Sequence, residues 1–261
     1  MIRTPVTLDL SQFPAQFYEL LEGADVYDSS CSKAARVYFI DKDGGFYLKT
    51  ADAGTLGKEA RLTRFFYKKG LSAEVLSYES EEKDWLLTRR IPGEDCIHAQ
   101  YMEDPKRLSQ LTGALLRQLH ETDHTGCPVP DRTANYIDTA VRNYHNCNYD
   151  ATLFPDNWGY ACAEDAFAVV QEFSTALKTD TLLHGVYCLP NIMLDNWQFS
   201  GFIDLDSGGV GDRHIDLFWG DWTLQFNLKT DAYRERFLDA YGRDRIDMDI
   251  LNSIGAFEVF I

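Results

Sequence analysis

The chain has 261 residues, which is long enough for one large domain or for two lobes around a cleft. Apolar residues make up 45% of it and aromatic residues 13%, enough for a packed core, so the composition excludes a disordered chain. The formal net charge of -16 disfavours nucleic acid and anionic membranes as partners, because both bind clustered Lys and Arg. It suits a polycationic ligand, and it equally suits a solvated surface that aids solubility.

The first part of the chain has the pattern of a small, strand-rich lobe. Short runs of β-branched and aromatic residues alternate with turn residues, and Asp-Gly-Gly between two such runs is typical of a hairpin turn. Gly70 marks the end of a helix whose apolar residues share one face. The expected elements are a helical lead-in at 13–21, strands at 35–41 and 45–50, a helix at 57–69 and a strand at 84–88.

The pattern becomes helical after Pro92 and Gly93, which form the best candidate hinge. We therefore expect one lobe over residues 1–91 and a larger, helical lobe over residues 92–261, an α+β organisation. One helix carries a buried leucine stripe with i, i+3, i+7, i+11 spacing. The features expected here are that stripe (Leu108, Leu111, Leu115 and Leu119), helices at 163–177 and 231–241, and an exposed loop at 143–157.

Cysteine usage and the N-terminus indicate the compartment. The six cysteines are scattered, without a C-x-x-C pair, and in a chain of this length they are weak evidence for disulfides. The first residues lack the apolar stretch of a signal peptide, and no segment resembles a membrane span. We expect a reduced, cytoplasmic protein without a membrane partner.

Three ordered segments in the second half carry residues suited to phosphoryl transfer. Residues 184–191 read His-Gly-Val-Tyr-Cys-Leu-Pro-Asn, Asp204 follows thirteen residues after Asn191 at the end of Gly-Phe-Ile-Asp, and residues 211–217 read Gly-Asp-Arg-His-Ile-Asp-Leu. Phosphoryl transfer needs a divalent metal held by oxygen ligands, and an Asn and an Asp carry the oxygens that Mg²⁺ prefers. Each segment alone recurs by chance, whereas the ordered set favours a kinase-type site over residues that only cap turns.

These segments resemble the active-site core of the aminoglycoside phosphotransferase family, and the likeness runs from Ser29 to Phe260. Residues 188–195 and 256–260 are especially similar to the 3′-acting members. The resemblance implies a protein-kinase-like two-lobe α+β fold with an ATP- and Mg²⁺-binding cleft between the lobes. It also implies transfer of the ATP γ-phosphate to a hydroxyl of a polycationic aminoglycoside, with antibiotic resistance as the consequence.

Two charged residues of the first lobe match the family's nucleotide machinery. Lys49, in Phe-Tyr-Leu-Lys, matches the Lys that contacts the ATP phosphates, and Glu59 matches the helix Glu that positions it. A partly buried Lys needs such an anionic partner. Read alone, each residue is more typical of an ordinary surface charge, but their order and spacing favour the ion pair. By the same resemblance, Asn191 and Asp204 are the metal ligands.

Further nucleotide contacts follow from the resemblance. Ser29 and Ser30 begin the segment in the place of the loop that covers the nucleotide; it contains no glycine here, but hydroxyl and backbone N–H groups still donate to phosphate. Tyr38 matches an aromatic residue that stacks on adenine in some relatives, although an aromatic residue in a half-buried strand is nearly as good an interpretation. The backbone from Arg89 to Ile91 would meet the adenine edge.

The acceptor side departs from the family pattern. Asp150 and Asp156 lie where relatives carry an acid-rich substrate loop, yet a solvated face explains them at least as well. Glu258 matches a substrate-binding Glu, but Ile261 follows the family's terminal Phe and displaces its carboxylate. Ser207 replaces a family Arg. A kinase for another small-molecule alcohol therefore stays open beside the aminoglycoside acceptor.

Val186 stands in the position of the family's catalytic Asp. A Val side chain accepts neither a hydrogen bond nor a proton, and a general base contributes about 10²–10⁴-fold to rate. One interpretation is an inactivating substitution in an otherwise competent enzyme, and another is a nucleotide-binding pseudokinase. A third is that Asp206 substitutes as the base, because alternation along a strand would direct it to the same side as Asp204.

Overall fold

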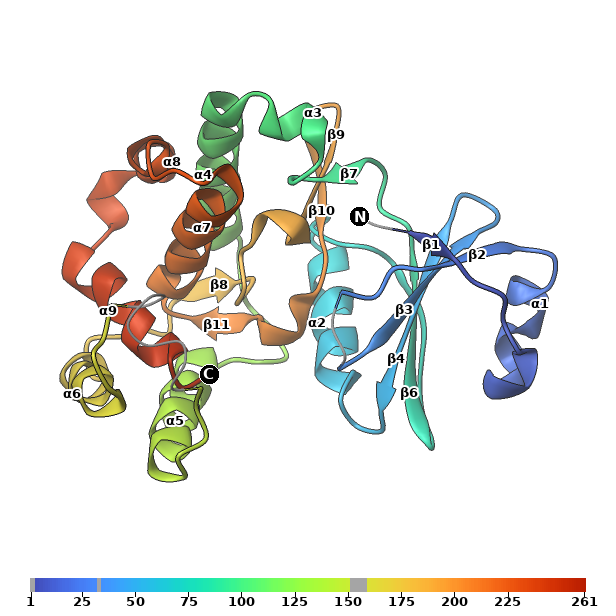
Figure 1. Ribbon diagram of the computed structural model, residues 1–261, viewed down its shortest axis with the longest axis horizontal. Helices are drawn as coiled ribbons and strands as arrows, with labels where there is room; N and C mark the ends of the chain where they lie inside the picture. The colour runs from blue at the N-terminus through green and yellow to red at the C-terminus, as the bar shows by residue number, and fades with distance from the viewer. Residues whose placement is uncertain (1–2, 32–33, 151–158) are drawn as a thin grey trace. The chain divides into compact units, whose positions relative to one another are not determined.

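The computed structural model describes residues 3–31, 34–150 and 159–261. The chain forms two compact units, one of residues 1–98 with 190–206 and the other of residues 99–189 with 207–261 (Figure 1). The first unit thus includes a later segment of the chain besides its N-terminal part. The lobe boundary expected between residues 91 and 92 stays a prediction.

The first unit contains a six-stranded antiparallel sheet in the order β1-β2-β3-β4-β6-β5. The expected hairpin turn is confirmed: Asp43, Gly44 and Gly45 all have positive φ, between 49° and 97°, a backbone conformation that glycine adopts without strain. The expected strands are confirmed with small shifts of their ends. The strands are β1 (Thr4–Pro5), β2 (Asp25–Asp28), β3 (Arg36–Asp41), β4 (Phe46–Asp52), β5 (Val75–Ser80) and β6 (Lys83–Arg89).

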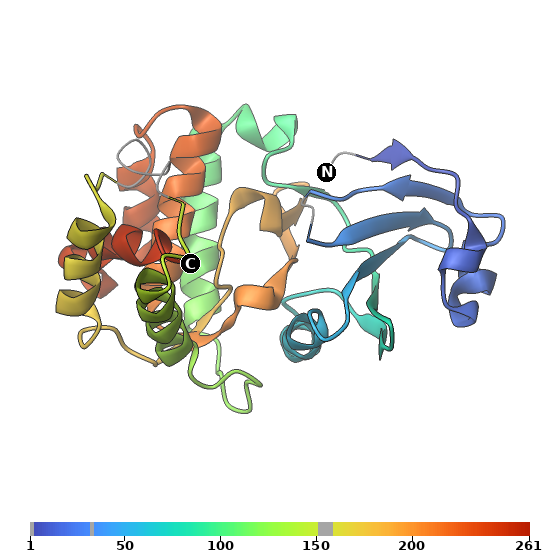
Figure 2. The same ribbon diagram turned by 60° about the horizontal axis from the view of Figure 1, so that its bottom comes forward.

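The two faces of this sheet are covered by different helices. The helical lead-in is a 3-10 turn over Ala15–Phe17 followed by α1 (Tyr18–Leu21), and it packs on one face around Trp85. The opposite face carries α2 (Gly57–Tyr67). Figures 1 and 2 show α1 and α2 on opposite sides of the strands. Because side chains alternate along a strand, each residue of β3 and β4 belongs to one of these two faces.

A second, three-stranded sheet completes the first unit, with β9 (Ile192–Asp195) between β10 (Gln198–Phe202) and β7 (Glu94–Asp95). Gly93 precedes β7 with φ 89°, and a Cβ there would lie 2.0 Å from the Leu194 carbonyl oxygen. Close approach of two backbones therefore requires glycine at this position. Asn191 directly precedes β9 and Asp204 closely follows β10, so the pairing of these two strands brings Asn191 and Asp204 close together.

The second unit is mainly helical. The leucine stripe is confirmed: Leu108, Leu115 and Leu119 are buried and Leu111 is half-buried. A two-stranded sheet pairs β8 (Thr181–Leu183) with β11 (Gly209–Gly211). The helices are α3 (Ala99–Met102), α4 (Pro105–His120), α5 (Arg132–His145), α6 (Ala163–Phe173), α7 (Arg213–Leu228), α8 (Arg234–Tyr241) and α9 (Met248–Glu258).

Two helices are shorter than the sequence suggests. The helix expected at 163–177 ends at Phe173, because the Ala176 N–H turns back to the Phe173 carbonyl oxygen at 2.9 Å. The helix expected at 231–241 begins only at Arg234. Conversely, α5 continues to His145 and takes up the first residues of the expected loop at 143–157.

Aromatic packing anchors the C-terminal helix in this unit. Tyr136 stacks on Phe257 with ring centroids 5.4 Å apart, and Tyr144 stacks on Phe167 at 3.7 Å. The side-chain amide of Asn143 donates to the Phe260 carbonyl oxygen at 2.7 Å. All six cysteines are free, and within the described ranges no helix has the length and apolar character needed to cross a bilayer.

Candidate active site

A three-membered ion cluster lies in the first unit. Alternation along β4 directs Lys49 to the face that carries α2, where its Nζ donates to Glu59 Oε2 at 2.8 Å and to Asp204 Oδ1 at 2.9 Å. Burial disfavours the charged ammonium, but the two carboxylates outweigh it and raise the pKa of Lys49. Burial likewise raises the pKa of Glu59, and Lys49 partly offsets this. The Lys–Glu pair expected from the sequence therefore forms.

Asp204 and Asn191 lie beside each other at the end of the β9–β10 hairpin. Asn191 closes a 3-10 turn over Leu189–Asn191, and its carbonyl oxygen accepts the Ile203 N–H at 3.1 Å. Asp204 adopts φ 59°, a left-handed conformation that is uncommon outside glycine, and its side chain is 56% exposed. Such strained backbone residues are frequent at functional sites.

These two residues fit a magnesium ion that is shared with a nucleotide. Among the described residues, no group of three or more His, Cys, Asp and Glu is arranged to hold a metal. Mg²⁺, however, commonly takes only one or two oxygen ligands from protein and completes its shell with phosphate oxygens and water. The Asp204 carboxylate and the Asn191 amide would supply such a pair, and the Lys49 ammonium lies next to the carboxylate.

Tyr38 does not lie on the face that carries Lys49. It pairs in register with Leu48, is 6% exposed, and packs edge-on against Phe13 with ring centroids 5.3 Å apart. The structure therefore corrects the adenine-stacking assignment in favour of a core aromatic residue. The physical reason is the two-residue alternation of β-strands, which separates Tyr38 from Lys49.

Tyr47 is the aromatic residue of β4 on the same face as Lys49. It stands two residues before Lys49, is half-buried, and its ring lies 5.2 Å from that of Phe39 in the paired strand. The Arg3 guanidinium donates to the Tyr47 hydroxyl at 3.0 Å and lies 3.7 Å from the Phe39 ring centroid. Counting back by two from Lys49 places Tyr47 on this face from the sequence alone.

Ser29 and Ser30 build the connection that leads into β3. The Ser29 N–H donates to the Val37 carbonyl oxygen at 2.8 Å, and the Ser30 hydroxyl accepts the Val37 N–H at 3.0 Å. The Ser30 N–H donates to Asp28 Oδ1 at 2.9 Å, and hydrogen bonds from the Ser30 side chain and backbone lower the pKa of Asp28. The two serines hold the loop closed at its base, and phosphate binding by them stays a prediction.

The segment from Arg89 to Ile91 follows β6. The N–H groups of Arg89 and Arg90 donate to the carbonyl oxygens of Glu74 and Gly45, so both are committed within the unit. Ile91 is buried, and a Cβ on Gly201 would approach its Cδ1 to 2.8 Å. The N–H groups of Arg89 and Arg90 are thus already hydrogen-bonded within the unit. Of the three residues, Ile91 is therefore the most compatible with the expected main-chain contact to adenine.

A buried carboxylate in the second unit organises the segment of residues 184–191. Asp216, on α7, accepts the His184 N–H at 2.7 Å and the Gly185 N–H at 2.8 Å, and His120 Nε2 lies 3.3 Å from Oδ2. Gly185 has φ 93°, and a Cβ there would lie 1.9 Å from the Ser207 carbonyl oxygen. Asp216 belongs to the motif at 211–217, but its role in holding this loop emerges only from the fold.

Val186 follows directly in this loop and is half-buried. Its N–H faces His184 Nδ1 at 3.4 Å, and its carbonyl oxygen accepts the Cys188 N–H at 2.8 Å. The neighbouring Tyr187 is buried, and its hydroxyl donates to the Thr112 carbonyl oxygen at 2.8 Å. Tyr187 is thus tied into the core of the unit and does not replace the missing carboxylate.

The strand-alternation argument for Asp206 is wrong. The strand β10 ends at Phe202, and Leu205–Ser207 forms a 3-10 turn instead of continuing it. The Asp206 carboxylate lies 3.5 Å from Lys58 Nζ and its side chain is 49% exposed. Asp206 is therefore paired with a lysine of α2, and the alternation rule gives no information about its direction.

Glu258 is half-buried at the end of α9 and accepts two hydrogen bonds. Its Oε1 accepts the Tyr136 hydroxyl at 2.7 Å and the Trp219 indole N–H at 3.1 Å. Burial raises the pKa of Glu258 to about 7, against the lowering effect of these hydrogen bonds. Asp150 is exposed beyond α5, and Asp156 lies outside the described residues. Of the residues expected to bind the acceptor, Glu258 is the one whose carboxylate is oriented by described hydrogen bonds.

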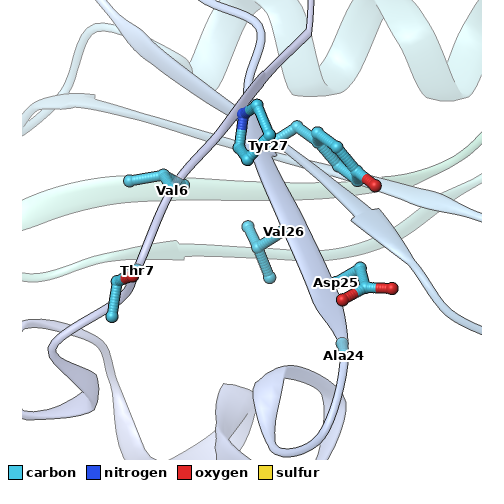
Figure 3. A pocket seen from close by; sticks show the side chains of 7 residues that line it. Val6, Thr7, Ala24, Asp25, Val26 and Tyr27 are labelled. Carbon is cyan, nitrogen blue, oxygen red and sulfur yellow. The ribbon is translucent and has the colours of Figure 1, made fainter.

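A pocket of about 220 Å³ lies elsewhere in the first unit (Figure 3). It borders β1 and β2, at the end of the strand order away from β5, whereas Lys49 belongs to β4. The pocket is therefore separate from the ion cluster, and Asp25 is the one carboxylate among its lining residues. Its lining residues are Pro5, Val6, Thr7, Ala24, Asp25, Val26 and Tyr27.

The sequence is similar to proteins of known name. A family model described as the phosphotransferase enzyme family matches residues 29–251. The chain is 48% identical over 256 residues to a probable aminoglycoside 3'-phosphotransferase of Lactococcus lactis, with 97% of each chain covered. It is 29% identical over 167 residues to an aminoglycoside 3'-phosphotransferase of Niallia circulans, with 64% of this chain and 63% of that protein covered.

The fold is also similar to solved structures. A type VIII aminoglycoside-3'-phosphotransferase superposes with a TM-score of 0.73 at 22% identity, with 96% of each chain covered. An aminoglycoside phosphotransferase from Streptomyces rimosus, in complex with ADP and streptomycin, superposes with a TM-score of 0.72 at 20% identity, with 96% of this chain and 99% of that chain covered. The expected protein-kinase-like two-lobe α+β fold is thereby confirmed.

Proposed function

Because the chain belongs to the aminoglycoside phosphotransferase family, we propose that it binds ATP with Mg²⁺ and that its site is built to transfer the γ-phosphate to an aminoglycoside hydroxyl. The observation that carries the proposal is the cluster in which Lys49 bridges Glu59 and Asp204. We further propose that Val186 slows this transfer strongly without removing nucleotide binding.

The nucleotide half of the mechanism uses residues of the first unit. Lys49 holds phosphate oxygens, and Glu59 keeps its ammonium charged and oriented. Asp204 and Asn191 would hold Mg²⁺, which would supply positive charge to neutralise the phosphates. ADP and AMP-PNP complexes of two structurally similar phosphotransferases support ATP as the cofactor.

The acceptor half of the mechanism lacks its proton acceptor. Asp216 fixes the backbone of the loop through His184 and Gly185, so an aspartate in place of Val186 would have a defined position. The Val side chain orients no hydroxyl, and the expected deficit is about 10²–10⁴-fold. Residual transfer is expected because positioning and charge neutralisation do most of the work in a loose transition state.

Glu258 is the acceptor-binding group with the best support in the second unit. A polycationic substrate brings an ammonium group, which favours the ionised form of a carboxylate whose pKa burial has raised to about 7. The tyrosine and indole donors on Oε1 fix the orientation of the carboxylate. Asp150 and Asp156 are proposed as weaker contacts on the basis of sequence alone.

Restoring the aspartate tests this proposal. Val186→Asp is compared with the unmodified chain and with Val186→Asn, a matched control that is polar but accepts no proton, in an assay of kanamycin phosphorylation with Mg-ATP. A gain of about 10²–10⁴-fold for Val186→Asp alone is expected, matching the deficit. Equal rates for all three chains would contradict the missing-base account.

A non-catalytic nucleotide-binding protein is the second candidate. The combination of a complete Lys49–Glu59–Asp204 cluster with an apolar Val186 favours it. It predicts thermal stabilisation by Mg-ATP and no phosphorylated product with the Val186→Asp chain either. A panel of sugars and amino alcohols, assayed for ATP consumption, separates both candidates from a kinase for another small-molecule alcohol.

A further inference from the structure

The side chain of Asp84 is fully buried in the first unit, and the proposed phosphoryl transfer does not use it. Asp84 lies on β6 opposite Ala51 of β4, two residues along from the pair of Leu86 with Lys49. Opposite residues of antiparallel strands point to the same face, and side chains alternate along each strand. Because Leu86 shares an apolar cluster with Ala60 of α2, Asp84 lies on the face that carries α2 and Lys49.

Donors from other elements satisfy this buried carboxylate. Its Oδ1 accepts the Gly54 N–H at 2.9 Å, and its Oδ2 accepts the Leu56 N–H at 2.7 Å and the Tyr78 hydroxyl at 3.1 Å. Burial raises the pKa of Asp84, but hydrogen bonds from the Ser80 side chain and from the two N–H groups outweigh it and hold the pKa below its ordinary value. Asp84 is therefore ionised at neutral pH and ties the loop between β4 and α2 to β6.

The helix α2 has no capping side chain of its own. Leu56 occupies the N-cap position and makes no side-chain hydrogen bond to the helix. The first N–H groups of a helix have no partner inside it, and a polar residue at the N-cap usually accepts one of them. For α2 the acceptor comes from another strand, because Asp84 binds two N–H groups at the entry to the helix. Its negative charge also lies near the positive end of the helix dipole.

The first turn of α2 rests on Tyr78 as well. A Cβ on Gly57 would lie 3.0 Å from the Tyr78 hydroxyl oxygen, and this hydroxyl donates to Asp84. Two residues further along the helix, the buried Glu59 accepts a hydrogen bond from Lys49 Nζ at 2.8 Å. Asp84 and Tyr78 therefore hold the turn from which Glu59 reaches Lys49.

We infer that Asp84 is a positioning residue of the nucleotide site, which holds the first turn of α2 and thereby keeps Glu59 in contact with Lys49. This inference rests on the proposed function and deepens it by naming the group that sets the Lys49–Glu59 pair. Lys49 Nζ also donates to Asp204 Oδ1 at 2.9 Å. If the first turn shifts, Glu59 withdraws and Lys49 pairs with Asp204 alone, the carboxylate proposed to hold Mg²⁺. Loss of Asp84 should therefore weaken Mg-ATP binding through Glu59.

A double-mutant cycle on Mg-ATP binding tests the inference. Isothermal titration of the full chain measures the Kd with Asp84→Asn, with Glu59→Gln and with both changes, at a temperature where circular dichroism shows each chain folded. Asp84→Asn alone should raise the Kd about fivefold. In the Glu59→Gln background it should leave the Kd nearly unchanged, because a residue that acts through Glu59 then has nothing to position. Trp85→Leu, a change on the opposite face of β6, is the control that should lower the melting temperature without changing the Kd.

A second variant keeps the test decisive if Asp84→Asn does not fold. Tyr78→Phe removes one donor to the Asp84 carboxylate and keeps the ring in place. It should raise the Kd about twofold, and again only in the chain that retains Glu59.

The other outcomes separate this inference from the proposed function. An equal rise in Kd in both backgrounds, or no rise at all, would show that Asp84 does not act through Glu59, which overturns the inference while the proposed function stands. Mg-ATP binding that is insensitive to Glu59→Gln would overturn it as well. If the unmodified chain binds no Mg-ATP, the proposed nucleotide site and this inference both fail.

Discussion

The N–H group of Gly185 donates to Asp216 Oδ1 at 2.8 Å, so a buried carboxylate on α7 sets the backbone of the loop that carries Val186. Asp216 is fully buried, and a second backbone N–H, that of His184, donates to its other oxygen. A buried carboxylate is tolerable because these donors satisfy it. The loop conformation therefore depends on a residue thirty places further along the chain.

Asp216→Asn should destabilise the second unit. An amide replaces one acceptor oxygen by a donor, so one of the two loop N–H groups loses its partner in a buried site. The expected loss is about 2 kcal/mol in the free energy of unfolding, measured by urea denaturation. Asp138→Asn, an exposed change on α5, is the control and should have no measurable effect. Equal stability of the two variants would contradict the organising role of Asp216.

Gly185→Ala should cost much more than the same change at Gly126. Both glycines have positive φ, 93° and 78°, so both variants incur the left-handed penalty of about 1 kcal/mol. Only at residue 185 does the new methyl group meet a backbone oxygen, that of Ser207 at 1.9 Å, whereas nothing lies within 4 Å at residue 126. We expect a total loss of about 3 kcal/mol at residue 185, read from the two unfolding midpoints.

Tyr47→Leu and Tyr38→Leu should have opposite consequences. Tyr47 shares the face of Lys49, so its loss should weaken Mg-ATP binding severalfold with little effect on stability. Tyr38 packs against Phe13 in the core, so its loss should lower the melting temperature and leave the Kd for Mg-ATP unchanged. Calorimetric titration and thermal unfolding of both variants check this, and a raised Kd for Tyr38→Leu would restore its adenine-stacking role.

Glu258 should make both stability and acceptor binding depend on pH. Burial raises its folded-state pKa from 4.5 to about 7, so its contribution to stability is greatest below pH 4.5 and declines as pH rises towards 7 and above. An ammonium ligand favours the ionised form, so its binding should strengthen over the same rise. Glu258→Gln should flatten both profiles, measured as melting temperature and kanamycin affinity between pH 5 and 8. Unchanged profiles would contradict titration of this residue.

Local patterns were sufficient for several parts of the fold. The strands β3, β4 and β6, the helix α2 and the leucine stripe of α4 follow from periodicity and turn residues, which depend on neighbours along the chain. The strands β1, β2, β5 and β7 to β11 were not anticipated, because most of them are short and their pairing is set by distant partners. The ends of α6 and α8 likewise depend on turns that periodicity does not encode.

For the candidate site, too, the sequence indicated the residues, and only the structure showed their contacts. Lys49, Glu59, Asn191, Asp204 and the loop with Val186 were assigned from the resemblance of their motifs to those of the family, and an ammonium group and oxygen ligands are the groups that phosphates and Mg²⁺ need. Tertiary structure alone decided that Lys49 bridges two carboxylates, that Tyr38 belongs to the core, and that Asp206 pairs with Lys58. Sequence specifies which groups are present, whereas strand register and packing decide which of them meet, since contacts between distant residues depend on the whole fold.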